Sequence, residues 1–219
     1  MTNELDLKRL ERKAWASFFE DGLLDIFMGL VLVGVGIPAV LPGIFVSELT
    51  QNVGAAALAA LAFLPYWAGK KWITVARVGR AEFSRARKSR QTRVAVIYAI
   101  SVVAGVIVLL MVMLGLSSSP PAWVRRLGLE WFLALGIGGW MFLILGLASY
   151  FMDYRRGYLI AALYALAFGG TVVLHNPIMF IVAGILGVLM GAVIFVRFIQ
   201  THPKPAELEA DARYDGASW

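Results

Sequence analysis

Long apolar runs separated by short polar segments occupy most of the chain. A helix needs about 20 mostly apolar residues to cross the hydrocarbon core of a bilayer. Among Lys, Arg, Asp and Glu, two residues fall inside such runs, Asp25 in the first and Arg197 at the end of the last. The pattern predicts an all-α fold, a six-helix transmembrane bundle within residues 22–199. The six spans are expected at residues 22–42, 53–69, 94–116, 131–150, 158–175 and 178–199.

The segments before and after these runs have different characters. Residues 1–21 are predicted to form a cytoplasmic amphipathic leader helix at the membrane interface, because apolar residues fall on one helical face: Leu7, Leu10, Ala14 and Phe18. The alternative is a solvated leader to the first span. No small-residue cleavage pattern follows, so we expect this segment to be retained. Residues 200–219 are expected to be a flexible cytoplasmic tail.

Composition and charge agree with a membrane protein and give an orientation. Charged residues make up 16% of the chain, below the roughly 25% usual in soluble domains, and the mean hydropathy is +0.76. Cytoplasmic loops of membrane proteins are enriched in Lys and Arg. Of the 20 Lys and Arg residues, all but Arg125 and Arg126 lie on the side of the amino terminus. Both termini are therefore predicted to be cytoplasmic, and the net charge of +6 needs no nucleic-acid partner.

The segment 70–93 is the most basic part of the chain. Its Lys and Arg residues are predicted to bind anionic lipid head groups or a protein partner: Lys70, Lys71, Arg77, Arg80, Arg85, Arg87, Lys88, Arg90 and Arg93. The alternative is a topology determinant without a specific ligand. Loose alternation and Gly79 predict an extended or hairpin-like start to this cytoplasmic loop.

Carboxylates at the start of the first span are the sharpest candidate for a polar site. Asp21 and Asp25 lie four residues apart and so share a helical face. Negative charge at a helix amino terminus explains Glu20 and Asp21, whereas Asp25 lies about one turn deeper, where an acid is usually paired or lines a wet cavity. Arg155 and Arg156, before the fifth span, are the candidate partners. A structural ion pair and a functional inner-side site both remain open for Asp25.

Small residues predict close packing between spans. Gly22, Gly29 and Gly36 recur every seven residues along the first span, and Gly187 and Gly191 lie four apart in the last. Such spacing lets membrane helices approach closely, either within one chain or in a homo-oligomer.

Catalytic and metal-binding patterns are weak in this sequence. The chain has no cysteine and two histidines, His175 and His202, which the predicted topology places on opposite sides of the membrane. We therefore expect no metal site and no cofactor. The favoured function is a non-enzymatic membrane protein that acts through protein partners or anionic lipid at its cytoplasmic face. The alternative is a small transporter or channel subunit for a neutral or lipophilic solute, and a lipid-modifying enzyme is the least supported class.

Three motifs resemble a group of prokaryotic six-span membrane proteins with no assigned activity. These are D-G-L-L-D at 21–25, the string K-K-W-I-T-V-A-R-V-G-R-A-E-F-S-R-A-R-K-S-R at 70–90, and V-R-F-I-Q-T-H-P at 196–203. The sequence departs from the group's loop pattern at Ala76, where that pattern has Pro, and at Arg80, where it has Tyr. The resemblance implies a multi-pass protein of a prokaryotic cytoplasmic membrane.

Overall fold

A computed structural model of the chain describes residues 19–41, 43–78 and 128–203, with isolated helical residues at 96, 99, 101, 103 and 105. All regular structure in these parts is helical. The elements are α2 (Leu23–Val40), α3 (Glu48–Leu61), α4 (Phe63–Gly69), the π-helix η1 (Lys70–Thr74), α5 (Val75–Val78), α8 (Leu129–Phe151), α9 (Gly157–Leu174) and α10 (Ile178–Thr201).

Five of the helical stretches in the described residues are long and apolar enough to cross a membrane. They are Leu23–Val40, Glu48–Thr74, Glu130–Phe151, Gly157–Leu174 and Ile178–Thr201. The prediction of an all-helical chain with several membrane-length helices is therefore confirmed at this level. The leader 1–18, most of the expected third span 94–116 and the tail 204–219 lie outside the described residues, so six spans, the sides of the termini and the amphipathic helix stay predictions.

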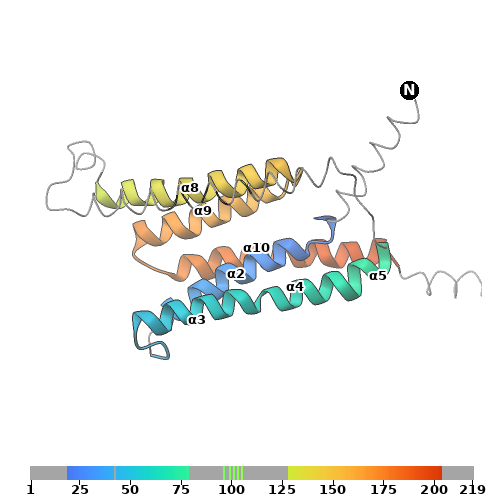
Figure 1. Cartoon of the computed structure of the whole chain (residues 1–219), viewed down its shortest axis with the longest axis horizontal. Coiled ribbons are helices and arrows are strands. Elements are labelled where there is room, and N and C mark those ends of the chain that lie inside the picture. Colours follow the sequence, from blue (N-terminus) through green and yellow to red (C-terminus); the bar gives the residue numbers. More distant parts are fainter. Residues whose placement is uncertain are drawn as a thin grey trace, which may run out of the picture.

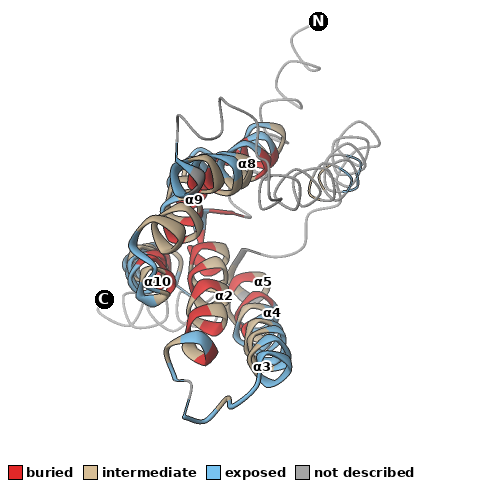
Figure 2. Ribbon diagram, turned by 90° about the vertical axis from the view of Figure 1, so that its left-hand side faces the viewer, coloured by how far each residue is buried: buried red, intermediate tan, exposed pale blue. Residues whose placement is uncertain are grey.

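The helices lie side by side in three layers (Figure 1). Helices α8 and α9 form one layer, α2 and α10 the middle layer, and α3 to α5 the third layer. Buried residues face the contacts between the layers, and exposed residues cover the outer surfaces (Figure 2). The starts of α2 and α9 and the ends of α5 and α10 lie together at one end of the bundle (Figure 1). We call this the acidic end, after Asp21 and Asp25.

Glycines bring α2 and α10 into backbone contact. A Cβ atom on Gly29 would lie 2.6 Å from the carbonyl oxygen of Gly184, and one on Gly191 would lie 2.6 Å from the backbone nitrogen of Ile26. These distances are too short for any side chain, so glycine is required at both positions. The contact contains every glycine that the spacing singled out for helix packing: Gly22, Gly29, Gly36, Gly187 and Gly191.

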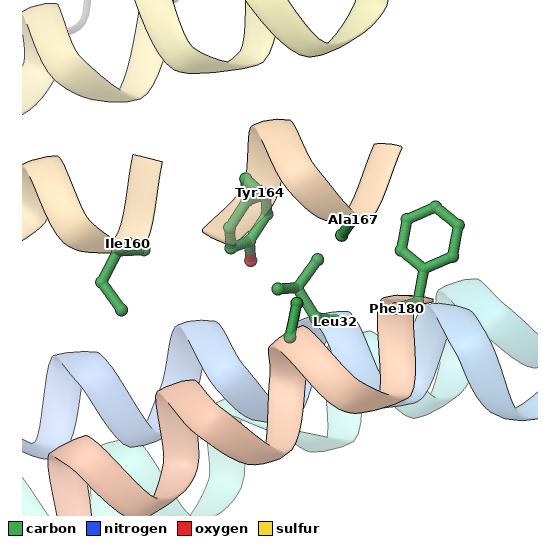
Figure 3. Close-up of a cluster of buried hydrophobic side chains, with 6 residues drawn as sticks. Leu32, Ile160, Tyr164, Ala167 and Phe180 are labelled. Atoms are coloured by element: carbon green, nitrogen blue, oxygen red, sulfur yellow. The ribbon is translucent and has the colours of Figure 1, made fainter. Parts of the chain in front are cut away.

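A buried apolar cluster joins the middle layer to α9. It includes Leu32 of α2, Tyr164 and Ala167 of α9, and Phe180 of α10 (Figure 3). The Tyr164 hydroxyl donates a hydrogen bond to the carbonyl oxygen of Met28 at 2.9 Å. Its polar atom is thus satisfied within a core where an unpaired group would cost about 1–3 kcal/mol.

The start of the basic segment corrects the sequence prediction. Residues 70–78 are helical rather than extended, because η1 and α5 continue the second membrane-length helix as far as Val78. The β-branched residues Ile73, Thr74 and Val75 produce the alternation that favoured a strand. Tertiary contacts outweigh that local preference, since Lys70 and Thr74 both bind Asp21 from this helix.

Candidate functional site at the start of α2

The chain makes a sharp turn just before α2. Gly22 has a φ of 71°, in the left-handed region that favours glycine, and a Cβ there would also lie 2.5 Å from the carbonyl oxygen of Gly191. The Asp21 side chain accepts a hydrogen bond from the Leu23 backbone N–H at 3.2 Å. Asp21 therefore satisfies one of the free N–H groups at the helix start while its carboxylate points into the bundle.

Asp21 is fully buried and binds two side chains of the second membrane-length helix. Its Oδ2 lies 2.7 Å from Nζ of Lys70 and accepts a hydrogen bond of 2.6 Å from the Thr74 hydroxyl. A helix-terminus charge effect was expected to explain this carboxylate, and that explanation is incomplete. Burial requires a paired and hydrogen-bonded charge, and Lys70 supplies the opposite charge.

Asp25 is also fully buried, about one turn further along α2. Its Oδ1 accepts a hydrogen bond from the Tyr154 hydroxyl. Its Oδ2 lies 3.6 Å from Nη1 of Arg156, which is an ion pair rather than a hydrogen bond, and Oδ2 has no hydrogen-bond partner among the described residues. Arg156 also donates a hydrogen bond to the carbonyl oxygen of Phe19.

The turn between α8 and α9 positions Tyr154 and Arg156. The Tyr154 backbone N–H donates to the carbonyl oxygen of Ser149 at 2.9 Å, and a Cβ on Gly157 would lie 2.0 Å from the Ser149 hydroxyl. The Tyr154 ring packs 5.5 Å from the Phe19 ring. Burial raises the pKa of the Tyr154 phenol, and the Asp25 carboxylate raises it further. Tyr154 therefore stays protonated at neutral pH and acts as a hydrogen-bond donor.

The structure brings together three of the four residues proposed for the inner-side site. Asp21, Asp25 and Arg156 meet at the acidic end, whereas Arg155 is exposed and forms no ion pair with a described residue. The sequence placed Lys70 among residues open to lipid head groups, but Lys70 is only 8% exposed and is committed to Asp21. Lys70 therefore belongs to the buried site.

Sequence reasoning missed Tyr154 and Thr74. Their hydroxyl groups carry no charge and lie far from the carboxylates along the chain, so no local spacing links them. The available signal was position, since Tyr154 directly precedes the two arginines and Thr74 lies four residues after Lys70. Lys70 and Thr74 lie one helical turn apart and can therefore reach the same carboxylate, whereas the turn between α8 and α9 brings Tyr154 and Arg156 together at Asp25.

Two of the remaining basic residues of the segment 70–93 fall within the described chain. Lys71 is exposed, with its Nζ 4.8 Å from the centre of the Trp67 ring. Arg77 is half-buried and donates a hydrogen bond of 3.3 Å to the carbonyl oxygen of Ile199, near the end of α10. The other predicted lipid-binding residues lie outside the described chain: Arg80, Arg85, Arg87, Lys88, Arg90 and Arg93.

The geometry at the acidic end favours holding helices together over reacting with a substrate. Each carboxylate faces a cation and a hydroxyl donor from another element, so the charges compensate within the bundle. Within the described residues, no three His, Cys, Asp or Glu side chains gather to hold a metal ion. His175 ends α9 and His202 ends α10, at opposite ends of the bundle.

Comparison of the chain with protein-family models, with curated proteins and with solved structures finds no match. The class of the protein is therefore defined by its own fold, a helical chain with several helices long and apolar enough to cross a membrane. Its particular feature is a pair of buried carboxylates at the start of α2, each paired with a cation from a different neighbour.

Proposed function

We propose that this chain is a six-span protein of a prokaryotic cytoplasmic membrane. Both termini and the segment 70–93 face the cytoplasm, and the protein acts without catalysis, by binding anionic lipid or protein partners at that face. The proposal places the acidic end on the cytoplasmic side, where the excess of Lys and Arg supports it. A homo-oligomer is compatible with this role.

One observation carries the proposal. Asp25 is bridged to Arg156 at 3.6 Å, directly beside the glycine contact between α2 and α10. A carrier for a solute would need polar groups lining a path from this end toward the middle of the membrane. Instead, the α2 face beyond Asp25 packs directly on α10, against its backbone at Gly29 and against Phe180 and Ile181 at Gly36. This favours a closed platform with a basic surface over a conducting path.

Aromatic residues at the acidic end support its position at a membrane surface. Trp67, Trp72, Tyr150 and Tyr158 are exposed there. Trp and Tyr are enriched at the membrane–water interface, where their rings are apolar and their N–H or O–H groups reach water. Exposed Trp131, at the start of α8, lies at the opposite end of the bundle. The two aromatic levels are compatible with one bilayer spanned by the helices between them.

Cysteine labelling tests the orientation. The natural chain has no cysteine, so Arg155→Cys and His175→Cys each introduce one reactive thiol at opposite ends. A membrane-impermeant maleimide added to intact cells should label the His175→Cys variant, and added to inverted membrane vesicles it should label the Arg155→Cys variant. The reverse pattern would overturn the proposed orientation, and labelling of both variants from one side would overturn the transmembrane fold.

A lipid titration in detergent and reconstitution into vesicles test the mode of action. The thermal unfolding midpoint in detergent should rise with added phosphatidylglycerol more than with phosphatidylcholine of the same chain length, because a ligand that binds the folded state stabilises it. Proteoliposomes should release a small neutral solute no faster than protein-free vesicles. Equal effects of the two lipids would contradict binding of anionic lipid, and faster release would favour the transporter or channel alternative.

A further inference from the structure

An apolar groove of about 310 Å³ lies between the first half of α2 and the second membrane-length helix. Ligand pockets in proteins run from about 300 to 1,000 Å³, so this groove has room for a narrow apolar group. Its walls include Leu23, Phe27, Tyr66, Trp72, Ile73 and Phe195. Trp72 is 65% exposed, so the groove opens on the outer surface of the bundle.

Arg77 stands at the end of this groove that points toward the acidic end. Ile73 and Phe195 both line the groove, and residues four apart on a helix lie on about the same face. One turn beyond Ile73 is Arg77, and one turn beyond Phe195 is Ile199. The Arg77 Nη1 donates to the Ile199 carbonyl oxygen at 3.3 Å, so the guanidinium lies about one turn beyond the lining residues Ile73 and Phe195.

No carboxylate of the described residues compensates the positive charge at this position. Neither Arg77 nor exposed Lys71 forms an ion pair with a described carboxylate, whereas neighbouring Lys70 is neutralised by Asp21. The Arg77 Nε is buried and has no hydrogen-bond partner among the described residues. A guanidinium has five N–H donors, and its planar fork matches the oxygens of a phosphate. The groove therefore lies next to a half-buried guanidinium that has N–H groups besides the one bonded to the Ile199 carbonyl oxygen.

We propose that this groove holds one acyl chain of an anionic phospholipid whose phosphate is bound by Arg77. The inference rests on the proposed function, because it names the site and the chemical class of the lipid within it. The acyl chain replaces water or loose lipid along the apolar walls, while Trp72 lies at the level of the head group. A lipid with no net charge would leave the local positive charge of Arg77 and Lys71 uncompensated, so the site prefers an anionic head group.

Native mass spectrometry of the full chain in detergent tests this proposal. The protein is titrated with phosphatidylglycerol or with phosphatidylcholine of the same acyl chains, and the Kd for the first bound lipid is measured. Arg77→Gln should weaken phosphatidylglycerol binding about tenfold, since it removes a charged hydrogen-bond donor. Ala68→Phe, which fills the groove from its wall, should weaken binding to a similar extent without changing any charge.

Matched controls separate the site from general effects. Arg155→Gln removes an exposed arginine at the same end, and Ala57→Phe adds the same ring to an exposed position on α3. Both should leave the Kd within twofold of wild type. The thermal midpoint of each variant checks its fold, and Ala68→Phe keeps the test decisive if Arg77→Gln unfolds. Glycerophosphoglycerol, the soluble head group, should not displace the lipid at matched concentration.

The outcomes distinguish this inference from the proposed function. If wild type prefers phosphatidylglycerol but Ala68→Phe and folded Arg77→Gln bind it as tightly, the groove is not the site, and anionic-lipid binding elsewhere still stands. Displacement by the soluble head group as effective as by whole lipid would also overturn a role for the groove. If wild type does not distinguish the two lipids, the inference and the lipid part of the proposed function both fail.

Discussion

Asp25→Asn should destabilise the protein, and the size of the loss follows from what remains after the change. The neutral amide can still accept the Tyr154 hydrogen bond, but it leaves Arg156 without its counter-charge. Breaking a fully buried ion pair costs about 3–5 kcal/mol. The Arg156 side chain is 27% exposed and also binds the Phe19 carbonyl, so water and that oxygen compensate part of the lost charge. We expect a loss of about 1–3 kcal/mol.

A double-mutant cycle isolates the ion pair from other effects of the substitution. Unfolding free energies are measured in detergent for wild type, Asp25→Asn, Arg156→Gln and the double variant. The double variant should be more stable than the sum of the single losses predicts, with a coupling of about 1–2 kcal/mol. Arg155→Gln is the matched control, because Arg155 is exposed and makes no ion pair with a described residue. It should change stability by less than about 0.5 kcal/mol.

Two results would refute this reasoning. If Asp25→Asn is neutral or stabilising, the carboxylate is kept at a cost to stability, which is the behaviour of a working site rather than a structural bridge. If Arg155→Gln couples to Asp25→Asn as strongly as Arg156→Gln does, Arg156 is not the specific partner of the Asp25 carboxylate.

Three further predictions concern the same end of the bundle. Lys70→Met should cost about 3 kcal/mol by chemical unfolding, because it leaves Asp21 buried without a cation, and a loss below 1 kcal/mol would contradict the pairing. Gly29→Ala should lower the thermal midpoint sharply because its Cβ meets the α10 backbone at 2.6 Å, whereas Gly139→Ala, with open space around it, should be neutral. The raised pKa of Tyr154 means that the folded state keeps this proton to higher pH than the unfolded state. The stabilisation that the protonated Tyr154 hydroxyl provides is therefore complete below about pH 10 and is lost as pH rises further. Wild type should accordingly lose more stability than Tyr154→Phe between about pH 10 and 11.5.

The membrane-length helices could be predicted from sequence because apolar length is a local property. The first, fourth, fifth and sixth expected spans lie close to helices that the structure describes, and the second begins earlier, at Glu48. Ser47 explains that earlier start. Its hydroxyl accepts the Thr50 N–H at 3.2 Å, and the Thr50 hydroxyl accepts the Ser47 N–H at 3.0 Å. This capping box makes a polar stretch helical before the apolar run begins.

The partners of the carboxylates could be predicted only in part. Arg156 could be predicted because it directly precedes the fifth apolar run. The predicted topology places the start of that run on the same side of the membrane as Asp25. Lys70 was counted with the solvent-facing cations, because its sequence neighbours are basic and nothing local indicates burial. Its pairing with Asp21 depends on α2 lying beside the second helix, with a π-helix at the point of contact. Such contacts between distant residues need the tertiary arrangement, which periodicity in one helix does not contain.

The two ion pairs have a consequence for how α2 is placed. Its glycine face lets the α10 backbone approach closely and already disfavours rotation, because a neighbouring side chain would clash with that backbone. A shift of α2 by one residue would move its side chains by about 1.5 Å and 100°. That shift would separate Asp21 from Lys70 and Asp25 from Arg156 together, on opposite neighbours, and would leave buried charges unpaired. The carboxylates therefore reinforce the register that the glycine contact sets for α2, and with it the geometry of the groove that α2 forms with the second helix.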